Sequence, residues 1–215
     1  MTSVFIAEDH TIVREGLKQI LTECPDIEIS GEAADGIEAI QKIRNGKMDV
    51  VLLDISIPGK NGLEVLKWIK SRDISLPVLM LSMHDEDQFA LRSLRAGASG
   101  YLTKQSAPEQ LVNAIRKVAS GGKYITPAVA EKLANSMDPS LEKSPHERLT
   151  DREDQVFRLL ISGNTVSEIA KDLSLSVKTI STHRTNILKK MNLHTNAELM
   201  YYAMSAGLGH FANIF

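Results

Sequence analysis

The sequence predicts an α/β domain with a parallel sheet, followed by a smaller all-α domain. Three observations lead to this prediction. Over the first 120 residues, short apolar runs alternate with amphipathic segments, which is typical of a parallel sheet covered by helices on both faces. Only helical patterns follow a stretch rich in proline and charge, and 215 residues exceed the usual size of one domain, about 100 to 150 residues. We expect domains over 1–122 and 147–211, joined by a linker helix and hinge over 123–146.

Five segments have the pattern of strands in such a sheet. The sequences VFIA, VVLLD and VLMLS are continuous apolar runs, as expected of strands buried on both faces. The predicted strands are Ser3–Ala7, Ile27–Ala33, Asp49–Asp54, Val78–Ser82 and Gly100–Thr103.

Helical periodicity lies between these strands. Four sets of apolar residues recur at helical spacing: Val13, Leu17, Ile20 and Leu21; Ile37, Ile40 and Ile43; Leu63, Leu66 and Ile69; and Leu111, Ile115 and Val118. We expect the last helix to begin with a capping box between Ser106 and Glu109, with Pro108 in its first turn. A connecting helix is predicted over Pro127–Met137, and a hinge over Asp138–His146.

The second domain is predicted from helix start signals. Three pairs fit a capping box, and Ser176 fits an N-cap; the pairs are Thr150 with Glu153, Thr165 with Glu168, and Thr195 with Glu198. The predicted helices are Thr150–Ser162, Thr165–Leu173, Ser176–Met191 and Asn196–Ala206.

Polar side chains lie at the carboxyl ends of four of the five predicted strands. They are Glu8 and Asp9 after the first strand, Asp54 at the end of the third, Ser82 at the end of the fourth, and Lys104 after the fifth. Because the carboxyl ends of parallel strands meet at one edge of a sheet, we expect these side chains to converge. Three carboxylates at one place repel each other unless a cation lies between them, and an all-oxygen ligand set suits Mg²⁺. A carboxylate can also attack a phosphoryl group, which makes Asp54 the candidate nucleophile with Lys104 beside it.

Each of these residues alone also has a simpler interpretation. A Glu-Asp pair after a strand is commonly a loop or capping feature, and an aromatic such as Tyr101 within a strand commonly serves packing. The coincidence of polar residues at four strand ends favours a site. We interpret His10 and His84, which flank it in the sequence, as solvated loop histidines.

These residues resemble the receiver domain of two-component response regulators. The resemblance covers about residues 1–120 and rests on Glu8-Asp9, Asp54 with Pro58 and Gly62, Ser82, and Tyr101 three before Lys104. It implies a flavodoxin-like (βα)5 fold with strand order 2-1-3-4-5. Gln105 departs from the pattern, because many receivers have proline directly after the lysine.

The resemblance also implies a role for each residue. Asp54 would accept the phosphoryl group, and Mg²⁺ would be held by Glu8, Asp9, Asp54 and the backbone carbonyl of Ser56. The Ser82 hydroxyl would move toward the phosphoryl group, and the rotamer of Tyr101 would change on phosphorylation.

In the second domain, Val166–Thr185 has two helical patterns joined by a turn. No acid occurs from Leu173 to Ala197, and one helix face carries hydroxyls and cations, namely Lys178, Ser181, Thr182, Thr185, Lys189 and Lys190. Hydroxyls and small apolar groups can read base edges in a major groove while Lys and Arg contact phosphates. The alternative is a solvated basic helix face.

The stretch Leu149–Leu199 resembles the LuxR-type helix-turn-helix domain of NarL/FixJ-class regulators. The matches are Leu149-Thr150, Arg152-Glu153, Gly163, Glu168-Ile169-Ala170, Leu175-Ser176, Thr179, His183, Lys190 and Glu198-Leu199. The resemblance implies that Ser176–Met191 is the recognition helix, with Ser181, Thr182 and Thr185 at bases and Lys178, Arg184, Lys189 and Lys190 as further DNA contacts. Asn196 stands where relatives often have arginine, and we interpret His183 as a packing or phosphate-contacting residue.

Composition limits the class of protein. The sequence is 43% hydrophobic and 24% charged with net charge −2 and one cysteine, and it contains no apolar run of the roughly 20 residues that a membrane helix needs. We therefore expect a soluble cytoplasmic protein that makes no membrane contact and has no internal disulfide.

Together these features predict a phosphorylation-dependent transcriptional regulator. A sensor histidine kinase or a small phosphodonor would phosphorylate Asp54, and the chain would bind double-stranded promoter DNA as a homodimer. The fourth helix of the second domain, Asn196–Ala206, would form the dimer surface. Catalysis would be limited to self-phosphorylation and autodephosphorylation. Two alternatives stay open: an aspartyl-phosphate hydrolase, although Ser56 stands where many of those enzymes have a second acid, and a receiver that only dimerises, without phosphorylation.

Overall fold

The structure is a computed structural model that describes residues 1–72, 75–83, 87–135 and 144–208. The chain divides into two compact units, Met1–Pro139 and Ser140–Phe215. The predicted hinge is described only from Ser144 onward, and His84, Met137 and residues 209–211 lie outside the described residues. Among the helices of the described ranges, none has the length and apolar character needed to cross a bilayer.

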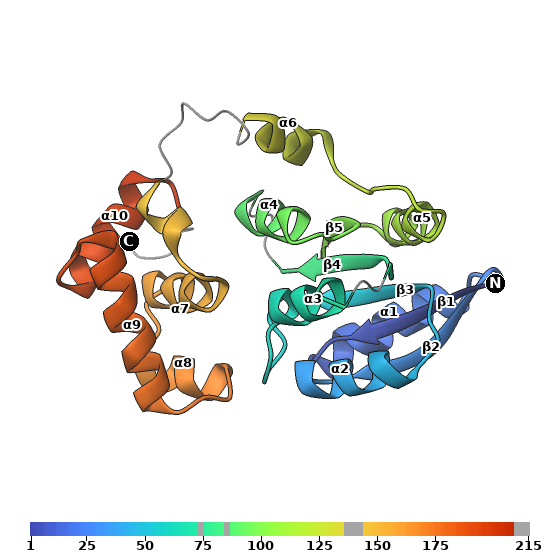
Figure 1. Ribbon diagram of the computed structural model, residues 1–215, viewed down its shortest axis with the longest axis horizontal. Helices are drawn as coiled ribbons and strands as arrows, with labels where there is room; N and C mark the ends of the chain where they lie inside the picture. The colour runs from blue at the N-terminus through green and yellow to red at the C-terminus, as the bar shows by residue number, and fades with distance from the viewer. Residues whose placement is uncertain (73–74, 84–86, 136–143, 209–215) are drawn as a thin grey trace. The chain divides into compact units, whose positions relative to one another are not determined.

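The first unit is built on a five-stranded parallel sheet with the order β2-β1-β3-β4-β5, as predicted (Figure 1). Its strands are β1 (Thr2–Ala7), β2 (Ile27–Ala33), β3 (Val50–Asp54), β4 (Val78–Ser82) and β5 (Gly100–Thr103). Both faces are covered, because alternate residues of one strand belong to different cores. In β3, Val51 and Leu53 join one apolar cluster while Val50 and Leu52 join the other.

In the described part of the first unit, the helices that accompany this sheet are α1 (Thr11–Thr22), α2 (Gly36–Asn45), α3 (Gly62–Lys70), α4 (Asp87–Arg95), α5 (Pro108–Ala119) and α6 (Pro127–Asn135). Buried residues of α1 and α5 belong to one cluster, and those of α2, α3, α4 and α6 to the other. The sheet is therefore the middle layer of three, which is the arrangement that the uninterrupted apolar strands predicted.

The predicted start of α5 is wrong by one residue. Ala107, not Ser106, is the N-cap, and its side chain makes no capping hydrogen bond. Ser106 lies one residue before the N-cap, and its hydroxyl lies 3.1 Å from that of Thr103. Pro108 occupies the first turn as expected, because the missing N–H of proline needs no partner there.

The helix α6, which was predicted as a connecting helix, packs against α4 within the first unit. The chain reaches it through Tyr124, whose N–H donates to the carbonyl of Ser99 and whose carbonyl accepts from the N–H of Tyr101. Val129 on α6 is buried in the same apolar cluster as Tyr101. The segment between α5 and α6 is therefore hydrogen-bonded to the beginning of β5 through Tyr124.

The second unit contains a short 3-10 helix η1 (Pro145–Arg148) and the helices α7 (Asp151–Ile161), α8 (Val166–Asp172), α9 (Val177–Met191) and α10 (Asn196–Ser205). The capping boxes at Thr150 and Thr165 and the N-cap at Ser176 are confirmed. At Thr195 only half of the box forms, since the Glu198 carboxylate accepts from the N–H of His194 instead. An apolar core of α7 to α10 residues, including Phe157, Ile169 and Ile187, holds the helices together.

Candidate functional site

Three of the residues predicted at the strand ends form a buried ion-pair cluster. Lys104 Nζ lies 2.7 Å from Oε2 of Glu8 and 3.0 Å from Oδ2 of Asp54. Glu8, Asp54 and Ser82 are buried to within a few per cent of their surface. The structure therefore brings two carboxylates and an ammonium group together, as the sequence predicted, with Ser82 buried at the end of the neighbouring strand β4.

Backbone contacts fix these side chains in place. The N–H of Lys104 donates to the carbonyl of Ser82 at 2.7 Å, which joins the ends of β4 and β5. The loop after β3 closes tightly, because the N–H of Gly62 donates to the carbonyl of Ile55. A Cβ at Gly62 would lie 2.2 Å from the carbonyl oxygen of Asp54, so only glycine allows this approach.

Burial and charge change the protonation behaviour of the cluster. Burial raises the pKa of Asp54 to about 6, with a further contribution from the negative charge of Glu8, while Lys104 and the backbone N–H of Ser56 oppose the rise. Burial lowers the pKa of Lys104, but its attraction to Asp54 and Glu8 outweighs this, and the net pKa is raised. Lys104 is thus a firmly charged cation beside a carboxylate whose charge is costly.

The donor set fits a hard divalent cation. Ligand atoms of Glu8, Asp9, His10 and Asp54 lie within 4.8 Å of one another. Oε2 of Glu8, Oδ1 of Asp9 and Oδ2 of Asp54 are buried and accept no hydrogen bond from the described part of the chain, although ion pairs with Lys104 and His10 reach them. Carboxylate oxygens of this kind are the ligands that Mg²⁺ prefers.

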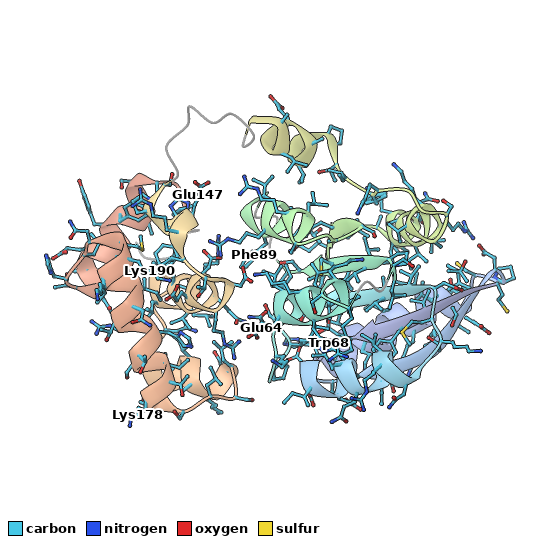
Figure 2. The ribbon with its side chains drawn as sticks, viewed as in Figure 1. Glu64, Trp68, Phe89, Glu147, Lys178 and Lys190 are labelled. Atoms are coloured by element: carbon cyan, nitrogen blue, oxygen red, sulfur yellow. The ribbon has the colours of Figure 1, made fainter. Side chains whose placement is uncertain are left out.

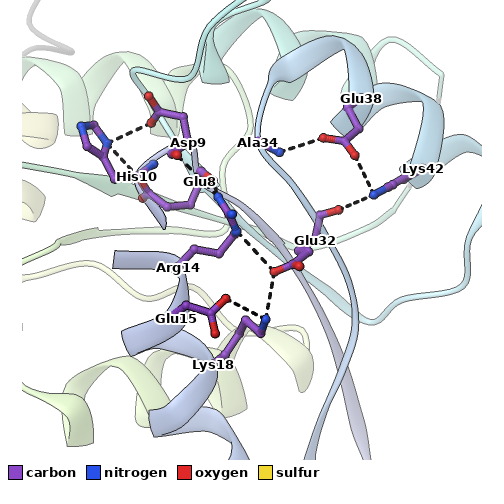
Figure 3. Close-up of polar contacts among 10 residues, drawn as sticks. All are labelled: Glu8, Asp9, His10, Arg14, Glu15, Lys18, Glu32, Ala34, Glu38 and Lys42. Atoms are coloured by element: carbon purple, nitrogen blue, oxygen red, sulfur yellow. Dashed lines mark hydrogen bonds and ion pairs between the residues drawn. The ribbon is translucent and has the colours of Figure 1, made fainter. Parts of the chain in front are cut away.

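Two further residues lie at this site: His10, which was predicted to be a solvated loop residue, and Arg14, which was not among the predicted residues. His10 Nδ1 lies 3.0 Å from Oδ1 of Asp9 and 3.2 Å from Oε1 of Glu8, so this exposed histidine contacts both acids (Figure 3). Arg14 donates to the carbonyl of Glu8 at 2.7 Å and pairs with Glu32. The signal for Arg14 was its place one turn into the helix that follows Glu8, which brings its side chain back over the strand end.

Two other predicted residues have positions that suit more than one role. Tyr101 is buried in the core and lines a cavity of about 650 Å³ together with residues of α4, α5 and α6. The position suits both packing and a rotamer switch, so the switch stays a prediction. The backbone N–H of Ser56 contacts Asp54, while coordination by the carbonyl of Ser56 also stays a prediction.

The second unit presents the predicted basic face along α9. Lys178, Ser181, Thr182, Thr185 and Lys189 are all exposed. Figure 2 labels Lys178 at the beginning of the helix. Asn186, one turn after Thr182, is exposed on the same side of the helix and was not among the predicted contacts.

Two predicted DNA contacts are engaged inside the unit instead. Arg184 Nε donates to Oδ1 of Asn196 at 2.7 Å, which ties α9 to α10. Lys190 Nζ lies 2.6 Å from Oε2 of Glu153 on α7. Arg184 is half-buried and Lys190 is exposed, and the roles of both as phosphate contacts stay predictions.

Comparison with known families covers both units. The family described as "Response regulator receiver domain" matches residues 4–116, and the family described as "Bacterial regulatory proteins, luxR family" matches residues 147–203. The chain belongs to the two-component response regulators of the NarL/FixJ type. Its second unit is accordingly a LuxR-type DNA-binding domain.

Relatives of this response regulator match it over nearly its full length. The response regulator UvrY of Escherichia coli K12 is 37% identical, with 97% of this chain and 96% of UvrY covered. The oxygen regulatory protein NreC of Staphylococcus carnosus is 36% identical, with 95% of this chain and 98% of NreC covered. The two-unit organisation is therefore shared with these curated response regulators.

A solved structure shows the same fold in a complex. RcsB from Salmonella enterica serovar Typhimurium, bound to promoter rprA in the presence of the phosphomimetic BeF₃⁻, matches with a TM-score of 0.63 at 29% identity. The match covers 95% of this response regulator and 100% of the RcsB chain.

Proposed function

We propose that this response regulator accepts a phosphoryl group on Asp54 and, once phosphorylated, binds double-stranded promoter DNA as a dimer. The observation that carries the proposal is the contact of Lys104 with both Glu8 and Asp54 in a buried cluster. A lysine in this position neutralises an anion that arrives at Asp54, which is the requirement for phosphoryl transfer to a carboxylate.

The residues divide the chemistry as follows. An oxygen of Asp54 attacks phosphorus, and the bond to the donor breaks with its electron pair going to the donor atom, the nitrogen of a phosphohistidine or the oxygen of acetate. Lys104 neutralises the transferred oxygens, and the Ser82 hydroxyl follows them. Glu8, Asp9, Asp54 and the carbonyl of Ser56 would hold Mg²⁺, which when bound lowers the charge at the site. Water later hydrolyses the acyl phosphate, which releases inorganic phosphate and returns Asp54 to the carboxylate.

The partners follow from the two units. A sensor histidine kinase supplies the phosphoryl group in the cytoplasm, and α10 is the surface through which two copies associate. On α10, Tyr201 is 75% exposed and Met204 is 56% exposed, three residues apart, which is an unusual exposure for such large apolar side chains. Association of two copies would bury them and pair two recognition helices on adjacent half-sites.

Acetyl phosphate with Mg²⁺ tests the proposal. The full chain should gain one phosphoryl group, measured by intact mass, and should bind a selected duplex more tightly after that gain. Asp54→Asn should abolish both changes, and a chelator should abolish the first. Steady turnover of a phosphate ester would instead support a hydrolase, and tighter DNA binding that survives in Asp54→Asn would sink the phosphorylation switch.

A further inference from the structure

The exposed face of α9 contains two threonines whose hydroxyls are turned back to the helix. Thr182 Oγ1 donates to the carbonyl of Lys178, and Thr185 Oγ1 donates to the carbonyl of Ser181, each at 3.0 Å. Both residues are exposed, and they lie on the same face as Lys178 and Lys189. These are the threonines expected to meet base edges.

The back-bonds decide what each threonine can offer to DNA. A hydroxyl has a single proton, and here that proton is used inside the helix. Donation to the acceptors of guanine or to O4 of thymine would require the back-bond to break. The γ-methyl group and the oxygen lone pairs remain, and the methyl is the branch that is turned away from the backbone carbonyl.

A serine in the same unit shows which part of threonine is distinctive. Ser162 Oγ donates to the carbonyl of Arg158 at 2.9 Å, so serine forms the same back-bond without a methyl group. The methyl is therefore the only group that threonine adds at these positions. Among the four bases, thymine alone presents a methyl group in the major groove, and apolar contact with it is a recognised form of direct readout.

We propose that Thr182 and Thr185 recognise thymine through contact between their γ-methyl groups and the thymine 5-methyl groups. The inference rests on the proposed function, because it requires α9 to lie in the major groove. The competing possibility is that the hydroxyl oxygens accept hydrogen bonds from the amino groups of adenine or cytosine. The methyl contact predicts weaker binding when the methyl group is removed from the protein or from the DNA. A hydrogen bond accepted by the hydroxyl oxygen predicts no such loss.

The experiment begins with selection of a binding site from random duplexes by the phosphodonor-treated full chain. Each thymine of the selected site is then replaced by deoxyuridine, which lacks only the 5-methyl group. At contacted positions the replacement should weaken binding about fourfold, the value expected for one methyl-sized apolar contact. The quantity to report is the ratio of affinities for thymine and uracil at each position.

Substitutions in the protein then assign the contact. Thr182→Ser or Thr185→Ser should bring that ratio to about one at a single position, because serine lacks the methyl group. Thr182→Val or Thr185→Val should keep the ratio, because valine keeps the methyl group and has no hydroxyl. Circular dichroism checks that α9 is still folded. Thr22→Ser is the matched control, since Thr22 makes the same back-bond to Lys18 on α1 and should leave every ratio unchanged.

Three outcomes separate the inference from its basis. Insensitivity of the wild-type chain to uracil at every selected thymine would overturn the methyl contact while leaving DNA binding intact. Loss of the ratio in the valine variants would also overturn it, in favour of the hydroxyl oxygen. Failure of the wild-type chain to enrich any duplex would overturn the proposed function and this inference with it.

Discussion

The two functional surfaces of this response regulator place their charges in opposite environments. Glu8, Asp54 and Lys104 are buried at the edge of the sheet, whereas Lys178 and Lys189 are exposed on α9. A buried charge is sensitive to each neighbour, because little water screens it. An exposed cation acts mainly through the local field and through release of counterions from DNA. The first surface is thus suited to a chemical event, and the second to salt-dependent binding.

The difference predicts that single substitutions act most strongly at the buried cluster. Lys104→Ala should slow phosphorylation by acetyl phosphate about 10²- to 10³-fold, because it removes the cation that neutralises the transferred oxygens. Phosphorylation rates from intact mass measure the effect. Lys47→Ala is the control, since Lys47 is an exposed loop residue. Equal rates for wild type and Lys104→Ala would refute the role given to this lysine.

The second unit also contains a buried ion pair outside both functional surfaces. It tests whether burial alone makes a substitution at a charged residue costly. Asp154 is fully buried, and Oδ2 lies 2.9 Å from Nε of Arg158, whose pKa is lowered to about 10 by burial. Asp154→Ala should destabilise the second unit by about 3 kcal/mol, because it leaves a buried guanidinium without this partner. Loss of the exposed pair in Glu15→Ala should cost less than about 1 kcal/mol.

The single tryptophan separates the two units in this measurement. Trp68 lies on α3, so its fluorescence follows unfolding of the first unit, while circular dichroism follows both. In urea, Asp154→Ala should shift part of the dichroism transition and leave the Trp68 transition in place. A shift of the Trp68 transition by the same amount would show that the units unfold as one.

The raised pKa of Asp54 predicts a pH dependence of the first unit. Its folded pKa of about 6 lies above the ordinary value of 3.8, so the folded state binds the proton more tightly than the unfolded state. This contribution to stability is complete below about pH 4 and is lost as the pH rises through 6. Asp54→Asn has no such loss and should be more stable than wild type at pH 7, by on the order of 3 kcal/mol.

Urea titrations of Trp68 fluorescence in chelator, at pH 4 and pH 7, measure this difference. Wild type and Asp54→Asn should differ at pH 7 and be nearly equal at pH 4. A difference of the same size at both pH values would mean that the carboxylate charge is not its cause.

Sequence patterns predicted the buried cluster at the strand ends better than the exposed basic face of α9. The strand ends position Glu8, Asp54, Ser82 and Lys104, and strand ends are readable because an apolar run stops there. Arg14 and His10 were missed or assigned to solvent, since their contacts depend on how the following helix begins. The helix α4 was not among the predicted periodic sets, although Phe89, Ala90 and Leu94 in its sequence DQFALRSLR pack into the core.

On α9 the sequence predicted a basic helix but not the direction of each cation. Charge and spacing place Lys178, Arg184 and Lys190 in one stretch without acids. The structure turns Arg184 toward Asn196 and Lys190 toward Glu153, both of which lie on other helices. Such contacts between helices distant in the sequence cannot be read from the pattern of α9 alone.

The smallest expected effect distinguishes Lys178 from Lys190, which is exposed but paired with Glu153. Lys178→Gln should lower the salt dependence of DNA binding by about one counterion, because an exposed lysine on this face is free to neutralise a phosphate. Lys190→Gln should leave that slope nearly unchanged, since its ammonium group is held by Glu153, and should instead lower the stability of the second unit. The slope is measured as log affinity against log salt concentration. Equal loss of slope in both variants would show that Lys190 exchanges Glu153 for a phosphate on binding, and that the basic face includes every lysine that the sequence assigned to it.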